Sequence, residues 1–126
     1  MPMIVWCAVL IAGGLGAVLR FLVDGAVARR AARSLHLVGL PYGTFVVNIS
    51  GAALLGLLGS LALSRHVALI ADTAFVGSYT TFSTWMLETQ RLTEEGQIRR
   101  AATNIVASVA VGIAAASLGQ WIAGRL

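Results

Sequence analysis

A run of glycine, hydroxyl and aromatic residues, Gly77–Trp85 (GSYTTFSTW), interrupts an otherwise apolar segment. Irregular backbone within hydrocarbon survives only inside protein or beside a water-filled path, because unpaired backbone groups there are costly. Hydroxyl groups donate hydrogen bonds, and the edge of an aromatic ring is electropositive. The run therefore indicates a place where an ion is held.

Several side chains of this region have both an ion-binding and a plain structural interpretation. Asn48 could donate its amide N–H to an anion or join two helices. Phe82 and Trp85 could turn their edges to an anion or pack ordinarily. The hydroxyls, which could form a donor track or bond to the preceding helical turn, belong to Thr80, Thr81, Ser83 and Thr84.

Three charged side chains lie in or near apolar segments, where an ionised group is expensive unless paired or functional. Glu88 follows the hydroxyl run, with a salt bridge to Arg91 as its structural alternative. Asp72 is expected near the membrane interface. Arg20 either extends to the interface or attracts anions into a vestibule.

The sequence contains no pattern typical of an enzyme. We find no Ser/His/Asp grouping, zinc-binding helix motif or phosphate-binding glycine loop. Cys7 is the only cysteine, which excludes an internal disulfide. The arginines do not follow one face and no nucleic-acid-reading motif is present, so we expect no nucleic-acid partner.

The composition predicts an all-α membrane protein. Hydrophobic residues make up 58% of the 126 residues, charged residues only 11%, and the mean hydropathy is +0.86, whereas soluble domains are about 25% charged. Four blocks are long enough to cross a bilayer as helices. We place these spans, which form a single domain over residues 1–126, near 4–23, 44–63, 67–90 and 101–123. The connection 24–43 is expected to hold a short interfacial helix.

The arginines predict how the spans are oriented. An even number of spans places both termini on one side. Seven arginines fall on the other side, at positions 20, 29, 30, 33, 91, 99 and 100, against Arg65 and Arg125 on the terminal side. Because basic loops stay cytoplasmic, we expect both termini outside, with Trp6 and Trp121 at the outer interface.

Three spans carry small residues at a spacing of four, which places them on one helix face. Such stripes are typical of close helix packing in lipid, and they would serve a path if their polar members converge. The stripes are Ala8, Ala12, Gly16 and Arg20; Asn48, Ala52, Gly56 and Ser60; and Asn104, Ser108, Gly112 and Ala116.

These residues together resemble the Fluc (CrcB) family of small bacterial fluoride channels. The matching segments are residues 13–20 (GGLGAVLR), 43–51 (GTFVVNISG) and 77–88 (GSYTTFSTWMLE). The resemblance implies an antiparallel dimer of four-span subunits, with the third span broken in mid-membrane, that passively exports toxic fluoride through the cell membrane.

The resemblance also implies roles for individual residues. Backbone carbonyls of Gly77 and Thr80 would hold a structural Na⁺ that is not transported. The fluoride path would use, or pass near, Asn48, Phe82, Thr84, Trp85, Glu88, Asn104 and Ser108. Close donors without fixed positive charge suit fluoride, which must be stripped of water, and freed carbonyls suit a hard cation.

Two residues depart from the family pattern: Trp85 stands where phenylalanine is usual, and Ser78 where glycine is usual. The arginine bias also differs from the near balance of members that insert in both directions. We therefore expect pairing with an oppositely oriented paralogue rather than with a second copy. The alternatives are a small proton-coupled multidrug exporter, disfavoured because residues 4–23 hold no carboxylate, and a non-conducting partner subunit.

Overall fold

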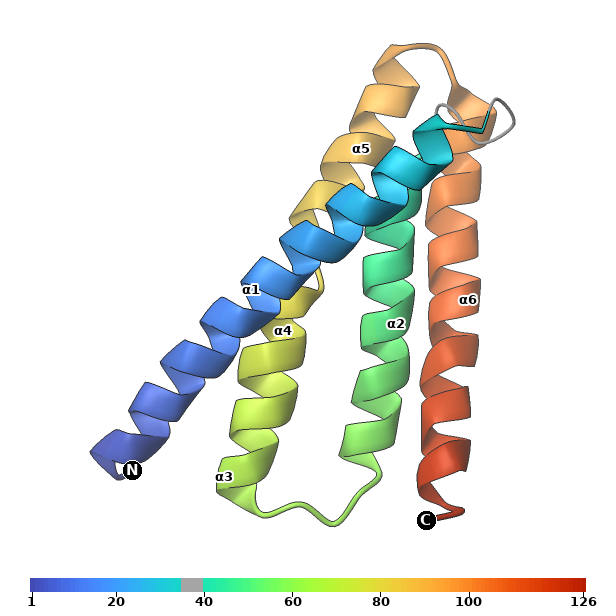
Figure 1. The fold of residues 1–126 in the computed structure, drawn as a ribbon. Helices are drawn as coiled ribbons and strands as arrows, with labels where there is room; N and C mark the ends of the chain where they lie inside the picture. The colour runs from blue at the N-terminus through green and yellow to red at the C-terminus, as the bar shows by residue number, and fades with distance from the viewer. Residues whose placement is uncertain (35–39) are drawn as a thin grey trace.

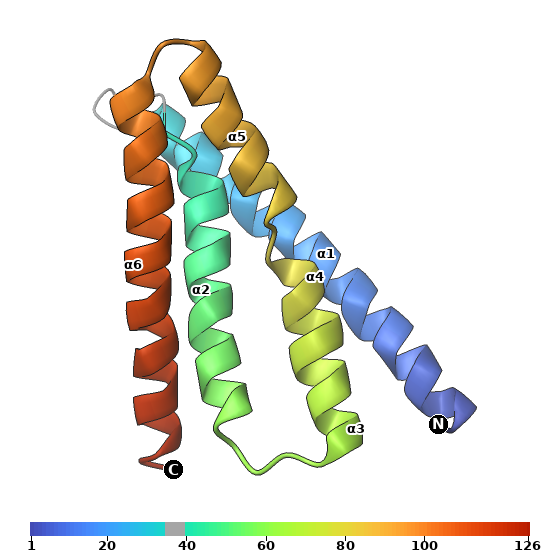
Figure 2. The same ribbon diagram turned by 180° about the vertical axis from the view of Figure 1, so that it is seen from behind.

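The computed structural model describes residues 1–34 and 40–126, and these residues form helices and no strands. The helices are α1 (Met3–Ala32), α2 (Tyr42–Gly59), α3 (Arg65–Ala68), the π-helix η1 (Leu69–Val76), α4 (Gly77–Tyr79), α5 (Ser83–Glu94) and α6 (Ile98–Ala123). Both termini lie at one end of the bundle, and the connection from α5 to α6 lies at the other (Figures 1 and 2).

Three of the described helices are long and apolar enough to cross a membrane: α1, α2 and α6. The predicted third span, 67–90, is divided among α3, η1, α4 and α5, so no single helix covers it. The division falls where the backbone leaves helical geometry at Thr80, whose ψ is 162°.

The first helix is longer than the sequence predicted. The apolar block ends near Val23, but α1 continues to Ala32, so the expectation that residue 24 begins a connection with its own short helix was wrong. Alanine and arginine are strong helix formers, so charge ends the apolar span without ending the helix. Residues 35–39 of the expected connection lie outside the described residues.

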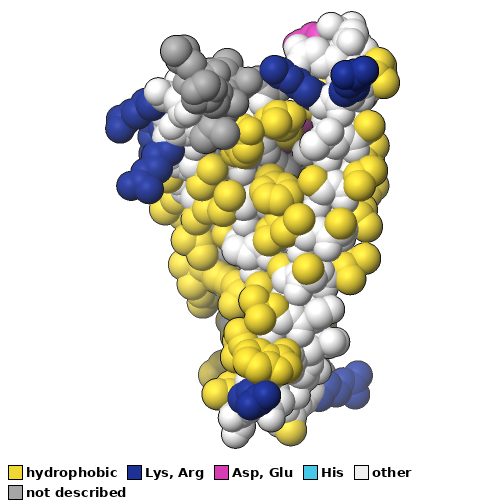
Figure 3. All heavy atoms as spheres, turned by 90° about the vertical axis from the view of Figure 1, so that its right-hand side faces the viewer, with side chains coloured by type: hydrophobic (Ala, Val, Ile, Leu, Met, Phe, Trp, Pro, Cys, Tyr) yellow, Lys and Arg dark blue, Asp and Glu magenta, His cyan; other side chains and the backbone are white. Residues whose placement is uncertain are grey.

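The bundle is apolar on the outside. Large side chains such as Leu10, Phe21 and Val106 are more than half exposed, and apolar atoms cover the middle of the face in Figure 3, with basic groups at both ends. A contiguous apolar surface of this kind marks contact with lipid or another chain.

Small residues allow the helices to approach closely. α2 packs along α6, where a Cβ at Gly56 would collide with the Ala116 backbone and one at Gly119 with Ala53. Gly16 of α1 lies equally close to the Phe75 carbonyl in η1. Helix packing thus accounts for three members of the stripes, Gly16, Gly56 and Ala116.

We expect Gly56→Ala to lower the free energy of unfolding by about 1–3 kcal/mol, because the added methyl group overpacks the contact with Ala116. The matched control is Gly59→Ala in the same helix, where a Cβ has no neighbour within 4 Å. SDS titration in detergent measures the free energy of unfolding of the two variants. Equal values for Gly56→Ala and Gly59→Ala would contradict this packing.

Candidate functional site

The helical path between η1 and α5 is interrupted at Thr80–Phe82. Thr80 has an extended backbone (φ −84°, ψ 162°), whereas α4 ends at Tyr79 and α5 starts at Ser83. The amide of Thr80 still donates to the Val76 carbonyl at 3.0 Å, as does its hydroxyl. The break is therefore confined to three residues, and Gly77, predicted to lie in it, remains helical.

Asn48 of α2 pairs with the backbone of the break. Its Nδ2 donates to the Thr81 carbonyl at 2.8 Å, and its Oδ1 accepts from the Thr81 amide at 2.8 Å. In a continuous helix that amide would bond the Gly77 carbonyl. Asn48 therefore replaces the helical hydrogen bonding at this point, and one N–H of its amide group is left over.

Neighbouring residues accommodate the irregular backbone. Gly51, one turn along α2 from Asn48, lies so close to the Thr80 methyl group that a Cβ would not fit. The Thr81 hydroxyl accepts from the Thr84 amide at 3.2 Å, which caps the start of α5. Sequence reasoning missed both roles. The Asn-x-x-Gly spacing on one face of α2 was the signal for the role of Gly51.

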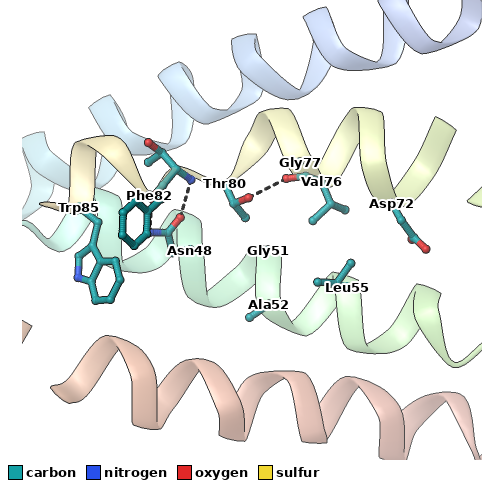
Figure 4. Close-up of a pocket in the computed structure, with 11 residues that line it drawn as sticks. Asn48, Gly51, Ala52, Leu55, Asp72, Val76, Gly77, Thr80, Phe82 and Trp85 are labelled. Atoms are coloured by element: carbon teal, nitrogen blue, oxygen red, sulfur yellow. Dashed lines mark hydrogen bonds between the residues drawn. The ribbon is translucent and has the colours of Figure 1, made fainter. Parts of the chain in front are cut away.

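A hollow of about 330 Å³ opens beside the break (Figure 4). Predicted site residues meet there, its lining including Asn48, Gly77, Thr80, Phe82 and Trp85. The Phe82 ring is 71% exposed and lies edge-to-face with Trp85, with ring centroids 5.7 Å apart.

The same hollow is lined by Asp72, whose Oδ1 is buried without a hydrogen-bond partner in the described part of the chain. This oxygen is therefore more buried than the expected position of Asp72 near the membrane interface implies. A buried carboxylate oxygen without a donor is costly, so this atom marks an incomplete surface.

A second hollow, of about 150 Å³, has a more polar lining that includes Arg20, Asp24, Thr44 and Thr84. Thr81 borders both hollows. Arg20 points to the break rather than out to the interface, since its Nη1 donates to the Thr80 carbonyl at 3.4 Å.

Glu88 accepts a hydrogen bond from the hydroxyl of Thr44, which is 3% exposed. The salt bridge that we gave as its alternative is absent among the described residues, because Arg91 instead lies 4.0 Å from Glu95. Thr44 is one turn from Asn48 on α2, so this helix contacts both the break, at Thr81, and α5 beyond it, at Glu88.

The two predicted residues of α6 occupy different settings. Asn104 is 6% exposed; its backbone carbonyl accepts from the Trp85 indole, and its side chain donates to Thr89. Ser108 has a buried Oγ that makes no hydrogen bond within the described residues. The structure thus joins Asn104 to Trp85 by a hydrogen bond, and within the described residues it shows no such bond for Ser108.

Comparison with known proteins identifies the family. The profile described as "CrcB-like protein, Camphor Resistance (CrcB)" matches residues 7–120. The chain belongs to the CrcB family. A CrcB relative from Mycolicibacterium paratuberculosis, named "Fluoride-specific ion channel FluC 2", is 66% identical over 119 residues, covering 94% of this chain and 93% of the relative.

Other CrcB relatives carry similar names. "Fluoride-specific ion channel FluC 2" of Mycobacterium tuberculosis (strain ATCC 25618 / H37Rv) is 62% identical, covering 94% of this chain and 90% of the relative. "Fluoride-specific ion channel FluC 1" of Leifsonia xyli subsp. xyli is 41% identical, covering 98% and 88%. These names confirm the resemblance and the prediction that the chain is no enzyme, and they do not favour a drug exporter. The chain is a multi-pass membrane protein.

We expect Asn48→Ala to accelerate hydrogen exchange of the Thr81 amide by about tenfold to a hundredfold, because two hydrogen bonds are lost. Ser50→Ala is the control: it removes a hydroxyl that contacts Tyr79 from the same helix but leaves the Asn48 pair intact. Exchange measured by NMR or mass spectrometry distinguishes the variants, and unchanged protection in Asn48→Ala would refute the pairing.

Proposed function

We propose that this chain is a subunit of a fluoride-specific channel that passively exports toxic fluoride across the bacterial cell membrane. The observation that carries the proposal is the break at Thr80–Phe82, held by Asn48 beside an exposed Phe82 ring. Relatives that are 66% and 62% identical to this chain are named fluoride-specific ion channels. The third predicted span would then be one membrane crossing, unwound midway.

The path would pass the two hollows that share Thr81. Fluoride attracted by Arg20 would reach the Thr84 hydroxyl, then the remaining N–H of Asn48 and the electropositive edge of Phe82. None of the last three groups carries a fixed positive charge, so they can replace water without trapping the ion. Glu88, Asn104 and Ser108 would lie along the continuation of this polar track.

A second chain would complete the site. Asp72 Oδ1 lacks a donor within the described residues, and the hollow beside it is open to the surface of a single chain. We propose an antiparallel dimer, with an oppositely oriented paralogue as the partner because the arginine bias favours one orientation. Relatives numbered FluC 1 and FluC 2 are consistent with paralogue pairs. Both termini would lie outside, which reporter fusions at Leu126 test.

A structural Na⁺ fits the oxygen donors of the break. Diversion of the Thr81 amide to Asn48 deprives the Gly77 carbonyl of its helical partner. The Thr80 carbonyl accepts only the long bond from Arg20 within the described residues and keeps a second lone pair. Carbonyl oxygens suit a hard cation, and the cation would offset unpaired carbonyls contributed by both chains.

Replacing external and internal Na⁺ by N-methyl-D-glucamine should slow fluoride efflux from liposomes, because the larger cation cannot occupy a cradle of two backbone carbonyls per chain. Efflux is followed with a fluoride electrode, and restoring Na⁺ should restore the rate. An identical rate in both media would argue against the sodium site.

Liposomes containing the chain and its paralogue should release fluoride rapidly and independently of a proton gradient. In the same assay, Phe82→Ile and Asn48→Asp should each lower the rate of fluoride efflux by about tenfold or more. Phe82→Ile removes an aromatic edge that contacts the ion, and Asn48→Asp adds a negative charge that repels fluoride. Phe45→Ile is the matched control, because Phe45 lines a different hollow, between α2 and α6.

The outcomes separate the candidate functions. Drug-coupled proton flux would favour an exporter. Flux only in the presence of the paralogue would identify an obligate pair, and flux from the chain alone, as an antiparallel dimer, would disprove the paralogue requirement. Unchanged flux in both variants would remove Phe82 and Asn48 from the path.

A further inference from the structure

The indole of Trp85 is tied to the neighbouring helix. Its Nε1–H donates to the backbone carbonyl of Asn104 at 3.3 Å. Indole has a single donor, so this hydrogen bond occupies the only polar group that distinguishes tryptophan from phenylalanine at this position. The N–H therefore points to α6 and does not serve an ion in the hollow.

We call the hydrogen bond from Trp85 Nε1 to the Asn104 carbonyl the tether. Two further hydrogen bonds close a ring with it. The Thr89 hydroxyl donates to the Trp85 carbonyl at 2.8 Å, and Asn104 Nδ2 donates to that hydroxyl at 2.9 Å. Thr89 and Asn104 are 8% and 6% exposed. Because buried polar groups are costly to leave unpaired, the ring fixes one turn of α5 against α6.

The fixed indole supports the Phe82 ring. The two rings are edge-to-face, at an interplanar angle of 78°, while Phe82 itself is 71% exposed. An exposed ring next to a break is free to change rotamer unless a neighbour holds it. In the described structure, the aromatic neighbour that holds it is Trp85.

We propose that Trp85 is a positioning residue, which acts through its tether to α6 by holding Phe82 in the orientation that faces the path. Fluoride contacts the Phe82 edge and not the Trp85 N–H. This inference rests on the proposed function for the role of Phe82, but the tether itself is independent of it.

The first test measures by spectroscopy whether the indole N–H of Trp85 is hydrogen-bonded. Trp6→Phe and Trp121→Phe, at exposed positions, leave Trp85 as the single tryptophan. Ultraviolet resonance Raman spectra should show a hydrogen-bonded indole N–H that is the same in sodium fluoride and sodium chloride. A band typical of a free N–H, or one that shifts with fluoride, would overturn the proposal.

The second test separates positioning from general stability. Trp85 is replaced by 3-benzothienylalanine, in which sulfur takes the place of N–H at nearly the same shape. We expect fluoride efflux from the conducting assembly to fall about five- to tenfold, as loss of one hydrogen bond predicts. The same replacement at Trp121 is the control and should leave efflux unchanged.

The third test asks whether the effect of replacing Trp85 on fluoride efflux depends on Phe82. In a Phe82→Ile background, the benzothienyl replacement at position 85 should have no further effect, because the ring that it positions is already gone. A full additional loss of about five- to tenfold would overturn positioning through Phe82. If the parent assembly does not conduct fluoride, the proposed function fails, while the Raman result still tests the tether.

Discussion

The amide of Asn48 is the interaction on which the site depends. By bonding both the N–H and the C=O of Thr81, one side chain does what a helical turn would otherwise do. An interrupted helix in hydrocarbon is tolerable only if its freed groups find such partners. The remaining features of the site follow from this pairing: the freed Gly77 carbonyl, the restart of α5 under the Thr81 cap and the exposed position of Phe82.

α2 organises the site more than any other helix. Thr44, Asn48 and Gly51 occupy successive turns of it and contact Glu88, Thr81 and Thr80 respectively. Each residue type is required by its contact: a hydroxyl for a carboxylate, an amide for a peptide group and no side chain for a threonine methyl group. The segment GTFVVNISG, through which the chain resembles its family, thus supplies the contacts that hold the broken segment and the start of α5 in place.

The sequence predicted the helical class. A run of hydroxyl, glycine and aromatic residues within an apolar block does not suit a continuous helix facing lipid, and the non-helical backbone at Thr80–Phe82 lies within that run. The sequence did not predict that Gly77–Tyr79 stay helical or that η1 is a π-helix. Both elements pack against α1, a contact between segments far apart in the chain that no local pattern encodes. The Thr44–Glu88 bond joins residues far apart in the chain, and no local pattern encodes it. The extension of α1 was not predicted either, because arginines that end an apolar span do not by themselves end a helix.

The close contact of α2 with α6 has a mechanical consequence. At Gly56 and Gly119 the two backbones meet with no side chain between them, so the pair has little room to slide. Long helices adjust their tilt to the thickness of the surrounding bilayer. A tilt imposed on α6 by a thinner or thicker membrane would pass directly to α2, and so to the peptide group that Asn48 holds.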